Sequence, residues 1–425
     1  MKLHSPHGPV SARPRRPRGR GQTLLAAALA IAAGAGAPAC GGGGGGGGGD
    51  AITVGLLLPF TGADSATSSN FERAVLFAAG RVNAAGGLGG RRLRIVSQDT
   101  HSDLDRALSS TQALIAAGAV AVIGPESADI AAVIAPILAQ NQVTFLSPLV
   151  GAGNDATVNC AQPWFRLAPS SHALGEGIAK LISAEGLAST SILYEVGAYN
   201  EALQAATRDR FVSLRGRVTL TIALDPLAQS YAAEVRSALA SNGASLVLAT
   251  SPRTGALVVN EVGALRPGGL RWFLSPLLQT ALLLENVAPS ALEGALGVAP
   301  KIYDTTAAFP EAFARRWQGD QPLQGAYFYY DAMALLTFAL HKTAPAAGSG
   351  AVDPVALQAA IVDAAAPPGE AIGWDEIESG LARQAGGSDV YYSGLTGPLL
   401  LDACGARLIG VTSTWEVQAG KILTR

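Results

Sequence analysis

Histidine and cysteine, the side chains that most often perform acid–base or nucleophilic chemistry, are scarce in this sequence. Among 425 residues, five are His and three are Cys. His101, His172 and His341 stand far apart, each on or beside an expected helix, which is typical of solvated or capping histidines. The sequence contains no Gly-x-Ser-x-Gly elbow, no Walker phosphate loop, no HExxH and no paired CxxC. We therefore expect no catalytic residues, no metal site and no cofactor.

Two further patterns look like sites and are better explained otherwise. Gly151 to Ala156 fits G-x-G-x-x-A after an expected strand, as in dinucleotide-binding folds. There the last position opens a long helix, whereas here Pro163 follows too soon for one. Asp99 and Asp103 bracket the end of another expected strand, and helix capping at Asp103 explains them better than a metal.

Composition narrows the class of protein. The chain has 30 basic and 32 acidic side chains, a net charge of −2, which argues against a general nucleic-acid binder. Hydrophobic residues make up 49% and charged residues 15%, so the chain as a whole is not disordered. The length suggests two or three domains.

The N-terminus has the pattern of a secretory signal. Residues 1–22 carry basic side chains and no acid, and the apolar run from Leu24 to Ala33 is too short to span a membrane. Ala39-Cys40 resembles the cleavage site of a bacterial lipoprotein, and the glycines from Gly41 to Gly49 form a flexible tether. We expect a signal peptide at 1–39, lipidation at Cys40 and a tether at 40–50. The alternative is an unmodified thiol at Cys40.

The rest of the chain alternates short apolar strands with amphipathic helices. This alternation predicts an α/β fold with parallel sheets covered on both faces, and its two runs predict two doubly wound, Rossmann-like lobes. The expected strands are Ala51–Leu58, Leu93–Val96, Ala119–Ile123, Val143–Leu146, Ser191–Tyr194, Val218–Ile222, Leu246–Ala249 and Trp272–Leu274. The expected helices are Asn70–Val82, Leu104–Ala117, Ile130–Ala139, Ile178–Ala184, Glu201–Leu214, Tyr231–Ser241, Gly255–Leu265, Phe309–Trp317 and Tyr327–His341.

Two segments, Trp164–Pro169 and Gly294–Pro300, are expected to cross between the lobes. A Gly/Ala/Pro-rich insertion follows His341. Beyond it, Leu399–Asp402 and Val411–Gln418 alternate like an antiparallel ribbon around a turn at Cys404-Gly405.

The motifs and their order resemble the type I periplasmic solute-binding proteins, in particular the leucine/isoleucine/valine-binding protein family. The stretches that carry the resemblance are VGLLLPFTG (54–62), RVNAAGGLGGRRLRIVSQD (81–99), AVAVIGPESA (119–128), VTFLSP (143–148), FRLAPS (165–170), AYNEALQAA (198–206), EGALGVAP (293–300), AYFYYDAMALL (326–336) and GPLLLDACG (397–405).

The resemblance implies two lobes joined by three crossing strands, with a small solute held between them. The implied lobes are 51–168 with 301–397, and 169–300 with 398–425. Hinge closure, a shift between open and closed forms, would then present the protein to the permease of an ABC importer. The alternative is a ligand-sensing receptor subunit that is not coupled to transport. A third class, an α/β enzyme, would need a nucleophile–base pair or a metal site, and the sequence shows neither.

The resemblance also places ligand contacts at the carboxyl ends of strands, where open α/β sheets bind ligands. When positions are counted without gaps between Gly124 and Ser147, the serine that receives an amino-acid carboxylate in the family falls on Ala128. Ser127 lies one position earlier. The threonine of that subsite falls on Gly151, and Tyr199 keeps the tyrosine of the second lobe. An aromatic falls on Ser251, and the acid that pairs with the ligand ammonium falls on Leu277. We expect branched-chain amino acids to bind weakly, and a less polar solute or a carboxylate to be favoured.

The two remaining cysteines, Cys160 and Cys404, border expected crossing segments. In the family these strands run side by side, so the resemblance allows a disulfide between them, with two separate thiols as the alternative. The implied protein is a monomer on the periplasmic side of the envelope, without nucleic-acid partners. Because Gly41 and not Asp follows Cys40, the outer membrane is favoured over the inner.

Overall fold

The computed structural model describes residues 51–151, 160, 163–266, 270–304, 306–348 and 350–425. The expected signal peptide, Cys40 and the glycine tether lie outside the described residues. In the part described, no helix is long and apolar enough to cross a membrane.

Lobe 1 is built on a parallel sheet of five strands in the order β2-β1-β3-β4-β5. The central strand β1 is buried along its whole length, which explains its uninterrupted apolar sequence. The strands are β1 (Ile52–Leu58), β2 (Leu93–Asp99), β3 (Ala121–Ile123), β4 (Thr144–Gly151) and β5 (Trp164–Ala168).

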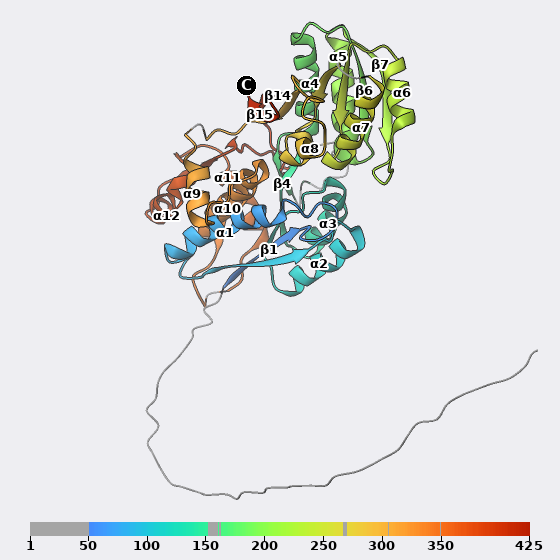
Figure 1. Ribbon diagram of the computed structural model, residues 1–425. Helices are drawn as coiled ribbons and strands as arrows, with labels where there is room; N and C mark the ends of the chain where they lie inside the picture. Colours follow the sequence, from blue (N-terminus) through green and yellow to red (C-terminus); the bar gives the residue numbers. More distant parts are fainter. Residues whose placement is uncertain (1–50, 152–159, 161–162, 267–269, 305, 349) are drawn as a thin grey trace, which may run out of the picture. The chain divides into compact units, whose positions relative to one another are not determined.

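Helices cover both faces of this sheet (Figure 1). Val54 and Leu56 of β1 belong to the core shared with α1 (Ser68–Ala84) and α10 (Gln324–Thr343). Leu57 points to the opposite face, into the core shared with α2 (Leu104–Ala116) and α3 (Ala128–Gln140). The two-residue period of a strand thus feeds two separate cores.

Lobe 2 is built on a seven-stranded sheet in the order β15-β14-β10-β9-β8-β6-β7. The five strands that come first in the sequence, β6 to β10, are parallel to one another. The last two, β14 and β15, pair antiparallel at one edge of the sheet. The strands are β6 (Ser189–Glu195), β7 (Arg217–Leu224), β8 (Ser245–Ala249), β9 (Arg271–Leu274), β10 (Leu296–Pro300), β14 (Thr412–Gln418) and β15 (Lys421–Thr424). The helices are α4 (Ser171–Ala184), α5 (Ala198–Ser213), α6 (Ala232–Ala240), α7 (Pro252–Leu265) and α8 (Ala281–Glu285), with a 3-10 turn η1 (Pro276–Leu278).

The segment after His341 is more ordered than its composition predicts. It forms α11 (Pro354–Ala364), β11 (Glu370–Ile372), a 3-10 turn η2 (Trp374–Glu376), α12 (Ile377–Ala385), β12 (Val390–Gly394) and β13 (Gly397–Pro398). Together with α9 (Ala308–Arg316) these elements extend the core of lobe 1. In Figure 1 the orange α9–α12 accordingly lie with the blue α1, whereas the red β14 and β15 lie with α4.

Two predictions about the connections are wrong in part. Leu399–Asp402 turns back at Cys404-Gly405 as predicted, and Leu401 forms an antiparallel bridge with Arg407. It does not pair with Val411–Gln418, because β14 pairs with β10 and β15 instead. Leu399 and Leu401 are apolar because they are buried in the core of lobe 1. The segments 164–169 and 294–300 form β5 and β10 inside the two sheets, and the chain crosses between the lobes after them.

The crossing segments run side by side. The Arg166 amide donates to Gly405 O at 2.8 Å, the Lys301 amide to Val411 O at 2.9 Å, and the Tyr303 amide to Leu395 O at 2.7 Å. Such backbone bonds between segments far apart in sequence hold the connections together and leave each lobe's core separate.

A buried polar network fastens the same region. The Asp331 carboxylate accepts four hydrogen bonds of 2.7–2.9 Å, from the Tyr392 hydroxyl, the Leu395 amide and the amide and hydroxyl of Thr396. The Arg407 guanidinium donates to Thr396 O at 2.5 Å and to Leu167 O at 2.9 Å. Burial raises the pKa of Asp331 and lowers the pKa of Arg407, so both charges depend on these partners.

Cys160 and Cys404 form a disulfide beside the crossing segments. Their Cα atoms lie 4.2 Å apart, and the bond closes a separation of 244 residues. The structure therefore favours the paired state over the two separate thiols that the sequence left open.

Candidate functional site

The candidate site lies where the carboxyl ends of the parallel strands of each lobe diverge. In lobe 1 the strand order places β1 between β2 and β3, and in lobe 2 it places β6 between β7 and β8. At such a switch point the connections leave on opposite faces of the sheet and polar loop residues gather, which is where open α/β sheets bind ligands.

Glu126 is the central acid of the lobe 1 switch point. It follows the Gly124-Pro125 turn after β3, and the Thr67 hydroxyl lies 3.2 Å from each of its carboxylate oxygens. Burial raises the pKa of Glu126 to about 8, the charge of Asp64 adds to the shift, and hydrogen bonds from Thr67 and Ser68 oppose it.

Only glycine fits at position 124. Its φ is +100°, and a Cβ there would lie 2.1 Å from Leu57 O on β1. The close approach of the two backbones directs the loop that carries Glu126 and Ser127 toward the carboxyl end of β1.

Asp64 lies on the loop after β1, near the end of β2. Its backbone amide donates to the Ser102 hydroxyl at 3.0 Å. Desolvation raises the pKa of the Asp64 carboxyl, a hydrogen bond from Ser102 lowers it, and the charge of Glu195 from lobe 2 raises it further.

Thr61, Asp99 and His101 form a hydrogen-bonded cluster beside Asp64. His101 Nδ1 lies 2.6 Å from Thr61 Oγ1 and 3.3 Å from Asp99 Oδ2. A nucleophile–base relay needs the two ring nitrogens to contact different partners, whereas here one nitrogen faces both. His101 and Ser102 have positive φ values of 55° and 54°, so the cluster secures a tight turn after β2.

The lobe 2 switch point is built on Glu195 and Ser251. Glu195 ends β6, and its Oε2 accepts hydrogen bonds from the Ser251 hydroxyl at 2.6 Å and the Ser251 amide at 3.2 Å. Ser251 also caps α7 by accepting from the Thr254 amide. Ser251 therefore fixes the position of the carboxylate.

One hydrogen bond joins α3 of lobe 1 to α5 of lobe 2. The Ala198 amide, at the N-terminus of α5, donates to Asp129 Oδ1 at 3.3 Å. Gly197 precedes it with a φ of +146°, and a Cβ at this position would lie 3.3 Å from Asp129 Oδ2. This contact brings the two switch points toward each other.

The lobe 1 residues that the family resemblance predicts as ligand contacts have structural roles that differ from one residue to the next. Ser127 caps α3 by accepting from the Ile130 amide at 3.3 Å, and Ala128 is the first residue of that helix. Ser147 is fully buried, and its hydroxyl accepts from Trp164 Nε1 at 2.6 Å, so it stabilises β4 against β5. At Gly151 a Cβ would lie 2.0 Å from Pro169 O, so a threonine is excluded by packing.

The lobe 2 residues are likewise divided. Ser251 is at the switch point, as described above. Tyr199 lies in the first turn of α5 and packs partly against the core under α4, and burial raises the pKa of its hydroxyl. Leu277 lies in η1 with 44% of its surface exposed and carries no charge.

The sequence analysis did not predict the acidic residues that the structure places at the switch points. Asp64, Glu126 and Glu195 each follow directly on the carboxyl end of a predicted strand or its loop. That position was the available signal, and the search for the family's acid at Leu277 obscured it.

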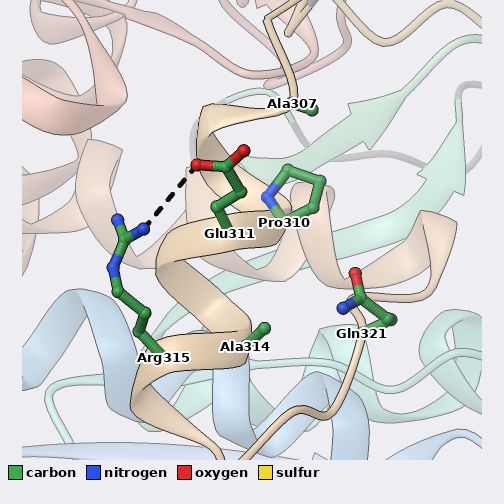
Figure 2. A pocket seen from close by; sticks show the side chains of 6 residues that line it. All are labelled: Ala307, Pro310, Glu311, Ala314, Arg315 and Gln321. Carbon is green, nitrogen blue, oxygen red and sulfur yellow. Dashed lines mark ion pairs between the residues drawn. The ribbon is translucent and has the colours of Figure 1, made fainter.

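Two surface depressions lie away from the switch points. The first, of about 560 Å³, is lined by Ala307, Pro310, Glu311, Ala314, Arg315 and Gln321. Figure 2 shows its Glu311–Arg315 ion pair along α9, whose 3.7 Å separation and exposure make it weak. The second, of about 700 Å³, lies beside His341, whose Nδ1 is 2.7 Å from Gln384 Oε1. Neither has a buried charge to hold a solute, and no metal-binding group of acids, His or Cys occurs among the described residues.

Several solved structures share this fold. A leucine-binding protein from Thermotoga maritima is 18% identical with a TM-score of 0.73, and the match covers 88% of this chain and 97% of that one. A branched-chain amino acid transporter substrate-binding protein from Streptococcus pneumoniae, in complex with isoleucine, is 14% identical with a TM-score of 0.71, covering 88% and 100%. A solute-binding protein from R. palustris in complex with benzoate is 18% identical with a TM-score of 0.69, covering 88% and 95%.

At these identities the structures establish the two-lobed α/β fold, which confirms the predicted fold class. No curated protein matches the sequence. The family described as periplasmic binding protein matches residues 51–367, about three quarters of the chain. The chain therefore belongs to the periplasmic binding protein family.

Proposed function

We propose that this protein is the extracytoplasmic solute-binding lipoprotein of an ABC importer, and that it captures a small amino-acid-like or carboxylate solute between its lobes. The observation that carries the proposal is the pairing of two switch points, one in each lobe, through the Asp129–Ala198 hydrogen bond. A solved leucine-binding protein and two substrate-binding proteins in complex with isoleucine or benzoate share the fold and support this proposal.

Hinge closure follows from how the lobes are connected. The proposed lobes are 51–168 with 301–397, and 169–300 with 398–425, except that Leu399 and Leu401 pack into the core of lobe 1. Their separate cores allow each to move as a rigid body, while the crossing segments keep their mutual hydrogen bonds. A solute that contacts both lobes stabilises the closed form, which a permease can distinguish from the open one.

Membrane anchoring completes the proposal. Cleavage before Cys40 and acylation of its thiol would place the glycine tether between the lipid and lobe 1. The protein would then act as a monomer on the periplasmic side, at the outer membrane in preference to the inner one. Recovery of the mature chain with acyl mass on Cys40 supports the anchor, and a mature mass without acyl chains contradicts it.

The function is tested by thermal denaturation of the purified full chain against a library of amino acids, amines and carboxylates. A solute present at a hundred times its Kd adds about 2.7 kcal/mol of stability, which raises the Tm by about 3 °C for a chain of this length. A solute that raises the Tm and is recovered unchanged supports capture. Turnover of the solute, or no stabilising solute in the library, contradicts it.

A further inference from the structure

The two edges of the lobe 1 sheet differ in charge. Strands β1 to β4 are parallel, so their amino ends lie at one edge and their carboxyl ends at the other. The connections that enter β2, β3 and β4 at the amino edge, together with the start of β2, are 85–94, 117–120 and 141–143. They hold three arginines and no acid. At the carboxyl edge, where the candidate site lies, the loops and first helical turns carry six acids and one arginine: Asp64, Asp99, Asp103, Asp105, Glu126, Asp129 and Arg106.

Two of the three arginines present their charge at the surface. Arg92 is exposed, and its side chain forms no ion pair or hydrogen bond with another described residue. Arg94 is also exposed, and its guanidinium donates to Thr53 Oγ1 at 2.9 Å and to Ala117 O at 3.3 Å, both of them uncharged acceptors. Arg91 is buried and donates to Gly350 O at 3.4 Å, so it supports the fold. Arg92 and Arg94 therefore offer positive charge that no acid in the described part of the chain neutralises.

The chain enters lobe 1 beside these two arginines. The Ile52 amide donates to Arg92 O at 2.9 Å, and the strand register places Thr53 opposite Arg94. The sequence before this point is Cys40, nine glycines and Asp50. A Gly-rich coil of this length spans roughly 17–20 Å. A lipid on Cys40 would therefore keep the amino edge of lobe 1 within that distance of the membrane surface.

The segments around the arginines are built from small residues. The Ala347 amide donates to Gly89 O at 3.2 Å, which joins the turn before β2 to the chain after α10. Residues 85–90 read AGGLGG and 343–348 read TAPAAG, without an acid. The next acid along the chain, Asp353, caps α11 by accepting from the Val355 amide. These segments thus leave few bulky side chains to hold a flat surface away from Arg92 and Arg94.

On the basis of the membrane anchor proposed above, we propose that the amino edge of lobe 1 is a membrane-docking surface, on which Arg92 and Arg94 contact the headgroup phosphates of anionic phospholipids. A guanidinium group matches the geometry of a phosphate and stays charged at any physiological pH. Each basic side chain at an anionic surface strengthens binding about fivefold, and the effect fades within a Debye length of about 8 Å. The lipid attaches the protein and the arginines orient it. The acidic edge with the candidate site then faces away from the membrane, where solute can reach it.

The test uses the acylated full mature chain in two kinds of vesicle, one of phosphatidylcholine alone and one of phosphatidylcholine and phosphatidylglycerol in equal amounts. A water-soluble glyoxal modifies arginine guanidinium groups, and mass spectrometry of the peptides gives the rate at each arginine. We expect Arg92 to be modified about fivefold or more slowly on the anionic vesicles, and high salt to remove the difference. Arg236, an exposed arginine on α6 of lobe 2, is the internal control and should change less than about twofold. Equal rates at Arg92 on the two kinds of vesicle would overturn the inference.

Variants locate the surface in the same assay. Arg92→Gln removes an exposed charge without a side-chain partner, so the variant should fold, and the protection of Arg94 on anionic vesicles should fall about fivefold. Arg236→Gln is the matched control and should leave the protection of Arg92 and Arg94 unchanged. Unchanged protection of Arg94 in Arg92→Gln would contradict a joint docking surface.

The outcome is separable from the proposed capture of a solute. Arg92 lies at the edge of the sheet opposite the candidate site, so Arg92→Gln should leave the rise in Tm with solute unchanged. A mature chain without acyl mass on Cys40 contradicts the anchor and with it the docking surface, while solute capture is decided by its own thermal test.

Discussion

Glu126 shows how a single buried acid links pH to stability. Its folded pKa of about 8 exceeds its ordinary value of 4.5, so the folded state holds its proton more tightly than the unfolded state. The stability that this proton provides is complete below pH 4.5 and is lost as the pH rises toward 8. Besides burial, the charge of Asp64 raises this pKa, and hydrogen bonds from Thr67 and Ser68 lower it.

Glu126→Gln should therefore remove this pH dependence. We expect wild type and variant to differ little at pH 4.5, and the variant to become more stable by about 1–3 kcal/mol near pH 9. Urea unfolding at several pH values measures the difference. A gap between the two proteins that does not change with pH would contradict the raised pKa.

Gly151 stands where the family resemblance expects a ligand-binding threonine, and we expect that packing requires a glycine there. A Cβ at this position would lie 2.0 Å from Pro169 O, an atom of the backbone that cannot move alone. Gly151→Ala should cost about 2 kcal/mol or more of unfolding free energy. Gly80→Ala is the matched control, because Gly80 lies within α1 with open space around its Cα and should gain up to about 1 kcal/mol.

At the scale of elements, periodicity predicts most of the two sheets. The buried run of β1 and the amphipathic spacing of α1 follow from local sequence, and the fold class is confirmed. The helices after His341 were not predicted, because the local sequence is rich in Gly, Ala and Pro. Their formation depends on packing of Leu357 and Ile361 into the core of lobe 1, which local sequence does not reveal. For the ribbon at Leu399–Asp402 only the predicted partner, Val411–Gln418, is wrong, because burial in a core and pairing in a half-buried strand leave the same apolar pattern.

The candidate site is less predictable for a related reason. The family resemblance placed Ser127 and Ser251 at strand ends as ligand contacts, whereas the structure shows that they cap α3 and α7, a local role that the sequence analysis did not assign to them. The hydrogen bond between Asp129 and the Ala198 amide joins two lobes through residues that are far apart in sequence, and no local pattern contains it. Sequence therefore identifies the strand ends but not which of their side chains meet.

The Asp331 network joins α10 to the crossing segments and should be a large source of stability. Its carboxylate is buried with four hydrogen bonds, so Asp331→Ala strands the Thr396 and Tyr392 donors. We expect a loss of about 3–5 kcal/mol in unfolding free energy. Asp363→Ala breaks only an exposed ion pair with Lys342 and should cost less than about 1 kcal/mol. Equal losses would contradict the role of the network.

At the scale of the whole molecule, the Cys160–Cys404 disulfide ties the chain across 244 residues. Loop-closure entropy gives an upper figure of about 5 kcal/mol for such a bond. Replacing both cysteines with Ala should lower the denaturant midpoint, whereas reducing agent should have no effect on that double variant. Two free thiols in the unfolded, unreduced wild type would contradict the bond.

The contact between Asp129 and Ala198 should set how readily the lobes close. Asp129→Asn removes the charge that accepts from the N-terminus of α5, at a hydrogen-bond distance of 3.3 Å and in a partly solvated place. We expect the open form to gain about 1 kcal/mol relative to the closed form, and the Kd for solute to rise about fivefold. Small-angle scattering of the protein with solute should then show a larger radius of gyration at partial saturation. Asp105→Asn, in the first turn of α2 and away from α5, is the control, and an unchanged Kd in Asp129→Asn would show that closure does not depend on this contact.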